Sequence, residues 1–164
     1  AGAAAGSALP AAATCAQVVG CPARNPTDEA ALELLALLLA PSGVRVYVAS
    51  SGLLVSEMVE LVVRARPAAV CLGAVGPGGL AHARYLLKRL GARELSAPVV
   101  VGRWTSPGRV PAARDRLAES GGVHVESSLA TAAAAVTQLA RGAGDDDRAK
   151  RQEVPHADMV RPAR

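Results

Sequence analysis

The sequence predicts an α/β fold, in which a parallel β-sheet carries helices on both faces. Short apolar runs alternate with longer amphipathic segments, and Gly/Pro-rich turns separate them. The clearest example is the apolar run 68–72, a turn at 73–79, an amphipathic segment at 80–90 and a second apolar run at 98–101. The chain is 51% hydrophobic but only 2% aromatic, so its core is built from Ala, Val and Leu. Such small aliphatic residues suit helices packed on a parallel sheet.

Five strand–helix units fit between Ala16 and Arg141. This number predicts a doubly wound, five-stranded parallel sheet with the flavodoxin-like strand order 2-1-3-4-5. The expected strands are residues 17–21, 44–49, 68–72, 98–101 and 123–125. Residues 1–15 are expected to form a flexible leader or linker, residues 16–141 the folded domain, and residues 142–164 a disordered polar tail.

The helix boundaries follow from capping residues. Asn25 is the expected N-cap of the first helix, with Pro26 as its first residue. Ser50 or Ser51 is expected to cap the second helix, and the last helix is expected to reach about Arg141. The predicted buried face of the first helix consists of Ala31, Leu34, Leu35 and Leu38.

Composition excludes several classes of function. The net charge is +4, but no basic run is interleaved with aromatic residues, which argues against nucleic-acid binding. Three cysteines, one of them inside a predicted strand, argue against a disulfide framework and favour a reducing, cytoplasmic location. No apolar run has the length of a membrane span.

The loops after the strands should converge on one edge of the sheet, where α/β proteins bind ligands. Helix N-termini at this edge favour anions, glycines let a ligand approach the backbone, and an indole can stack on a planar ligand. The same residues also have explanations that need no ligand: the glycines form tight turns, the tryptophan covers the edge of the core, and the arginine is exposed. Both interpretations stay open. The candidate ligand-binding residues are Asn25, Thr27, Ser50, Ser51, Gly76, Gly78, Arg103 and Trp104.

Catalytic signatures are missing from the sequence. Ser50 and Ser51 have no His and Asp companions at triad-like positions, and no Cys/His spacing suggests zinc. Cys21 ends the first strand but lies several residues before the helix that begins at Pro26. We therefore expect no enzymatic activity, no catalytic residue and no metal site.

Several segments together resemble a known family. They are Val44–Val48, Leu53–Arg66, Ala68–Leu72, Leu80–Leu90 and Val99–Trp104, with "HARYLLKRL" followed by "VVVGRW" as the most specific pair. These segments resemble cobalamin-binding-like domains, and most closely the soluble C-terminal domain of autoinducer-exporter-type permeases. The resemblance implies a regulatory domain of bacterial type, tethered through a preceding segment to a permease in the same polypeptide and responding to a small-molecule ligand.

The cobalamin motif itself is degenerate. An ungapped alignment with the family's Asp-x-His-x-x-Gly places Pro26, Asp28 and Ala31 at the three motif positions. A carboxylate does not replace the imidazole as a cobalt ligand, so no cofactor is expected. Alternatives remain: a cobalamin or other tetrapyrrole module of a regulator or methyl-transfer system, a small enzyme, or a self-assembling scaffold formed through the second and third helices, with a homo-oligomer left open.

Overall fold

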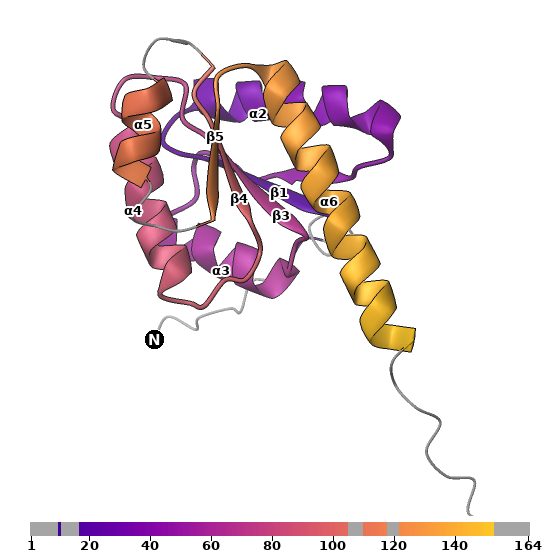
Figure 1. Cartoon of the computed structure of the whole chain (residues 1–164). Helices are drawn as coiled ribbons and strands as arrows, with labels where there is room; N and C mark the ends of the chain where they lie inside the picture. Colours follow the sequence, from indigo (N-terminus) through magenta and orange to yellow (C-terminus); the bar gives the residue numbers. More distant parts are fainter. Residues whose placement is uncertain (1–9, 11–16, 105–109, 118–121, 153–164) are drawn as a thin grey trace, which may run out of the picture.

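Five parallel strands form one sheet in the order β2-β1-β3-β4-β5 (Figure 1). A computed structural model of the chain describes residue 10 and residues 17–104, 110–117 and 122–152. This order and the helices on both faces confirm the flavodoxin-like α/β fold that the sequence predicts. The strands are β1 (Val18–Pro22), β2 (Val46–Val48), β3 (Ala69–Gly73), β4 (Val99–Gly102) and β5 (Val123–Glu126).

The helices form two layers with the sheet between them (Figure 1). Two helices, α2 and α6, pack side by side on one face, and α3, α4 and α5 cover the other. A short 3-10 helix, Ala40–Ser42, follows α2. The α-helices are α2 (Pro26–Leu39), α3 (Val55–Ala65), α4 (Gly79–Gly91), α5 (Val110–Leu117) and α6 (Leu129–Gln152).

The central strands are buried on both faces, which explains their near-continuous apolar sequences. Alternate residues point to opposite layers: Val70 and Val101 pack with α3, α4 and α5, whereas Cys71 and Val100 pack with α2 and α6. The sheet is therefore covered by helices on both faces, and its polar edges are the loops at the two ends of the strands.

Helix α2 begins where the sequence predicts, with Asn25 as N-cap and Pro26 as first residue. Its predicted buried face is wrong in part: Leu35 is buried, but Leu34 and Leu38 are 54% and 51% exposed. Residues 31–39 are apolar at every position but Glu33, so periodicity alone does not select a face, and packing against the sheet and α6 selects another one. The buried residues of α2 are Asp28, Leu32, Leu35 and Leu39.

Two other helix ends differ from expectation. The N-cap of α3 is Leu54, not Ser50 or Ser51, and its backbone N–H donates to Glu57 Oε2 at 2.8 Å. Helix α6 continues beyond Arg141 to Gln152, since the residues after Gly144 include several good helix formers. This end of α6 extends past the sheet (Figure 1). Within the described ranges, no helix combines the length and the apolar character that crossing a membrane requires.

Candidate functional site

The carboxyl ends of β1 and β3 form the switch point of the sheet, where the helices that follow neighbouring strands leave to opposite faces. Helix α2, which follows β1, lies on one face and α4, which follows β3, lies on the other. This is the place where open α/β sheets usually bind their ligands. The loops 23–25 and 74–78 border it.

The carboxylate of Asp28 fills this switch point. Asp28 is fully buried, and its Oδ2 accepts hydrogen bonds from the backbone N–H groups of Arg24 at 3.0 Å and Asn25 at 3.3 Å. Its Oδ1 accepts from Val75 at 2.8 Å and Gly76 at 3.4 Å, in the loop after β3. Backbone N–H groups that could hold an external anion are thus bound to an anion of the protein itself.

The sequence indicates Asp28 only as the residue at the histidine position of the cobalamin motif, and this structural role was not predicted. The detectable signal was the spacing Asn25-x-x-Asp28, which is a capping box. In the structure the Asn25 side chain accepts from the Asp28 backbone N–H at 3.0 Å, while the Asp28 carboxylate accepts from the Asn25 backbone. The contact with the loop after β3 depends on tertiary structure and has no local signal.

A cavity of about 230 Å³ lies beside the switch point, on the face that α3 and α4 cover. The loop after β1, the loop after β2, the first turns of α3 and the side of α4 enclose it. Three polar residues line it, Arg24, Ser51 and His82. The rest of its lining is mainly apolar, from Pro22, Ala23, Leu53, Leu54, Val55, Met58 and Leu86.

Two contacts fix the polar residues at this cavity. The backbone N–H of Ser51 donates to Glu29 Oε2 at 2.7 Å, which ties the loop after β2 to α2. Hydrogen bonds from the hydroxyl and the backbone of Ser51 lower the pKa of Glu29. His82 Nδ1 lies 3.2 Å from the carbonyl oxygen of Gly78, so this nitrogen acts as the donor.

Arg24 lies over the start of α4. A Cβ atom built on Gly78 would stand 3.2 Å from its Nη1, and the positive φ of Gly78, 76°, is the left-handed conformation that favours glycine. The guanidinium therefore lies close to the N-terminus of α4, near His82 in the first turn of that helix. Arg24 and His82 were not among the residues that we expected to bind a ligand.

The eight candidate residues do not form one group in the structure. Ser51 lines the cavity, whereas Thr27 is exposed on α2 and Ser50 accepts a local bond from Gly52 N–H at 3.2 Å. Asn25 and Gly76 meet around Asp28.

Arg103 and Trp104 lie away from the cavity, after β4. Arg103 Nη1 donates to the carbonyl oxygen of Ala74 at 2.6 Å. The Trp104 ring lies against Gly102 and packs with the α2 and α6 side of the core. Its indole N–H is buried without a hydrogen-bond partner among the described residues. The Arg103 side chain therefore joins the loop after β4 to the loop after β3, and Trp104 covers an edge of the core.

The nucleophilic and acidic groups near the sheet are held in inert environments. Burial raises the pKa of the Cys71 thiol to about 12 and also raises the pKa of Cys21, with a smaller contribution from Cys71. Asp28 is bound by backbone N–H groups. In the part of the chain that the structure describes, no group of three or more His, Cys, Asp or Glu side chains is placed to hold a metal ion.

The structure also tests the fit of cobalamin. In the alignment with cobalamin-binding domains, Asp28 stands where those domains carry their cobalt-binding histidine. Its carboxylate is fully buried and bound to the loops after β1 and β3. Turning its oxygens outward would break the hydrogen bonds that four backbone N–H groups donate to them. The residues at this position therefore do not fit a histidine-ligated cobalamin.

Comparison with known proteins supports the fold only. No family model and no curated protein matches the sequence. Among solved structures, the chain is similar to the signal receiver domain of a putative Luxo repressor protein from Vibrio parahaemolyticus, with 14% sequence identity and a TM-score of 0.55. The match covers 82% of this chain and 97% of that domain. At this identity the match shows a shared flavodoxin-like fold.

Proposed function

We propose that this chain is a non-catalytic regulatory domain that binds a small amphipathic carboxylate in the cavity between α3 and α4. The observation that carries the proposal is the lining of that cavity: Arg24, Ser51 and His82 on an otherwise mainly apolar wall. A guanidinium and an imidazole near a helix N-terminus favour an anionic head group, and the apolar wall favours a short hydrocarbon body. The similar receiver domain agrees with a regulatory role.

Asp28 makes this cavity a more favourable binding site for an anion than the switch point. Its carboxylate already occupies the N–H groups between β1 and β3, and like charges repel a second anion there. Arg24 and His82 lie on the other side of the loop after β1, where a ligand carboxylate meets positive charge. The resemblance to permease domains extends the proposal: the domain responds to its ligand as the cytoplasmic part of a membrane permease in the same polypeptide.

Isothermal titration with hexanoate tests the proposal. A ligand of this size is expected to bind with a Kd on the order of 1 mM, because few non-hydrogen atoms contribute. Arg24→Ala should weaken binding about tenfold, since a charge-assisted hydrogen bond is lost. Arg89→Ala, on the exposed side of α4, is the matched control and should bind as the wild type does.

Three outcomes would reject this function: no binding by the wild type at tens of millimolar (roughly ten times the expected Kd), equal binding by Arg24→Ala, or equal loss in Arg89→Ala. Incubation with hydroxocobalamin followed by gel filtration tests the tetrapyrrole alternative. Visible corrin absorption that co-elutes with the protein would favour tetrapyrrole binding over binding of a carboxylate ligand.

A further inference from the structure

The imidazole ring of His82 determines how the cavity beside the switch point can hold an anion. His82 is half-buried in the first turn of α4 and lines this cavity together with Arg24 and Ser51. Its Nδ1 lies 3.2 Å from the carbonyl oxygen of Gly78. A carbonyl oxygen only accepts hydrogen bonds, so Nδ1 is the nitrogen that carries the hydrogen in the neutral ring. This contact leaves Nε2 as the ring nitrogen that is available to a ligand.

Nε2 of the neutral His82 ring is a hydrogen-bond acceptor. A neutral imidazole has one donor nitrogen and one acceptor nitrogen, and the bond to Gly78 assigns the donor to Nδ1. A carboxylate offers lone pairs and no hydrogen, so it cannot form a hydrogen bond with Nε2 of the neutral ring. A proton on Nε2 turns the ring into a cation with a second donor, which binds a carboxylate through a charge-assisted hydrogen bond.

The surroundings of His82 favour the charged ring when an anion is bound. The Arg24 guanidinium lies near Gly78, where a Cβ atom would stand 3.2 Å from its Nη1. This guanidinium and the N-terminal end of α4 are both positive, so without a ligand they oppose a further positive charge. A carboxylate between Arg24 and His82 reverses this balance, because it attracts both cations.

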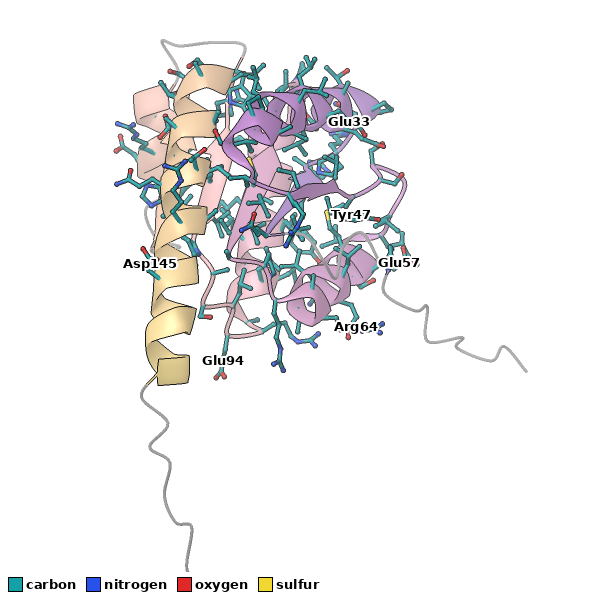
Figure 2. The ribbon with its side chains drawn as sticks, turned by 90° about the vertical axis from the view of Figure 1, so that its right-hand side faces the viewer. Glu33, Tyr47, Glu57, Arg64, Glu94 and Asp145 are labelled. Atoms are coloured by element: carbon teal, nitrogen blue, oxygen red, sulfur yellow. The ribbon has the colours of Figure 1, made fainter. Side chains whose placement is uncertain are left out.

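The other charged groups around His82 keep their charge near neutral pH. Helix α4 packs on α3 and on β3, and β3 contains no charged residue. Figure 2 shows Glu57 at the start of α3 and Arg64 near its end. The charged side chains on the elements around His82 are Arg24 after β1, Glu29 on α2, Glu57, Glu60 and Arg64 on α3, Arg66 just after α3, Arg84, Lys88 and Arg89 on α4, and Arg93 just after α4.

His82 is therefore the group of the described cavity wall whose charge changes between pH 6 and pH 8, as imidazoles do. Carboxylate, ammonium and guanidinium groups stay charged over this range. The pKa of Glu29 is lowered further by its hydrogen bonds with Ser51, so its carboxylate also stays charged. A change in ligand affinity over this range then reports the charge of His82.

We propose that the cavity binds its carboxylate together with one proton, which His82 takes up at Nε2 and donates to the ligand in a hydrogen bond. The proton comes from the solvent, Nδ1 keeps its own hydrogen, and no other bond changes. This inference rests on the proposed function and adds the regulation of the same site. The domain binds its ligand more tightly as the pH falls from 8 to 6.

Titrations of the 164-residue chain with hexanoate at pH 6 and pH 8 test the coupling. Hexanoate is ionised at both values, because such carboxylic acids lose their proton below about pH 5. The Kd should be about five- to tenfold lower at pH 6, since the charged ring adds a charge-assisted hydrogen bond. At pH 7 the ring Hε1 signal of His82 in proton NMR spectra should move toward the imidazolium position as hexanoate is added.

Two histidine variants form a matched pair. His82→Gln keeps a hydrogen-bond donor but cannot take up a proton, so its Kd should agree between the two pH values within about twofold. His124→Gln is the control, because His124 is an exposed residue of β5 outside this cavity, and it should keep the pH dependence of the wild type. The circular dichroism spectra of both variants should match the wild type, because neither histidine is fully buried.

The outcomes separate the proton coupling from the function on which it rests. An absence of hexanoate binding at both pH values rejects the carboxylate site and the coupling together. Binding with equal Kd values at pH 6 and pH 8 overturns the coupling and leaves the carboxylate site intact. The coupling through His82 is also overturned if His82→Gln keeps the pH dependence, if His124→Gln loses it, or if the His82 ring signal does not move.

Discussion

The Asp28 carboxylate lies 2.8 Å from the backbone nitrogen of Val75, 47 residues later in the sequence. This hydrogen bond joins the first turn of α2 to the loop after β3, across the switch point between β1 and β3. With the bonds from Arg24 and Asn25, it makes one buried side chain the common anchor of two loops. The cavity lies immediately beside this anchor, so the anchor holds one wall of the proposed site.

Replacing Asp28 should therefore destabilise the whole fold. Asp28→Ala removes the acceptor of four backbone hydrogen bonds and leaves a cavity at a fully buried position, which costs about 2–4 kcal/mol in the free energy of unfolding. Urea denaturation followed by circular dichroism measures this change. Glu33→Gln, on the exposed side of the same helix, should change it by less than about 0.5 kcal/mol. An equal, small effect of both variants would contradict the anchoring role.

The sequence could predict features that depend on residues close together in the chain, and it could not predict those that depend on contacts between distant segments. Asn25 and Pro26 start α2 through local capping, and the alternation of apolar runs with helices determines the strand order, so both were predicted. The exposure of Leu34 and Leu38 was not predicted, because a segment that is apolar at nearly every position has no preferred face until the sheet is formed. Arg24, Ser51 and His82 come from three loops or helices and meet only in the tertiary structure.

Gly73 should not tolerate a side chain at the end of β3. A Cβ atom there would lie 2.9 Å from the Asp28 backbone oxygen and 3.0 Å from Leu32 Cγ. Gly73→Ala should lower the free energy of unfolding by about 1–3 kcal/mol through overpacking. Gly91→Ala is the control, because a Cβ atom at Gly91 meets nothing within 4 Å. Urea denaturation measures the free energy of unfolding of both variants. Equal values for Gly73→Ala and Gly91→Ala would show that α2 does not pack this closely on β3.

Trp104 gives a fluorescence signal for the loop after β4, since it is the single tryptophan of the sequence. A Cβ atom on Gly102 would overlap the Trp104 ring, so Gly102→Ala should displace the indole from the core edge. We expect emission at longer wavelength in the folded variant. Gly142→Ala, where a Cβ atom has open space, should leave the spectrum unchanged. An unchanged emission spectrum of Gly102→Ala would show that the Trp104 ring does not lie against Gly102.

The buried thiols predict a loss of stability at high pH. Burial raises the pKa of Cys71 to about 12, above the value of about 8.5 for a thiol in the unfolded chain. Unfolding therefore releases a proton above pH ~8.5, and the free energy of unfolding falls as pH rises toward the folded pKa. Urea titrations at pH 8 and pH 10 should show this loss in the wild type. Cys71→Ala should show a smaller one, and an identical pH dependence would contradict the burial of this thiol.

We expect a carboxylate ligand to bind beside Arg24 and His82, because Asp28 excludes it from the switch point. A titration of ¹⁵N-labelled protein with hexanoate, followed by two-dimensional amide NMR spectra, tests both parts at once. The amides of Arg24, Ser51, Leu53, Leu54 and His82 should show saturable shifts that exceed those of Val75 and Gly76. Shifts centred on Val75 and Gly76, or no saturable shift, would contradict this expectation.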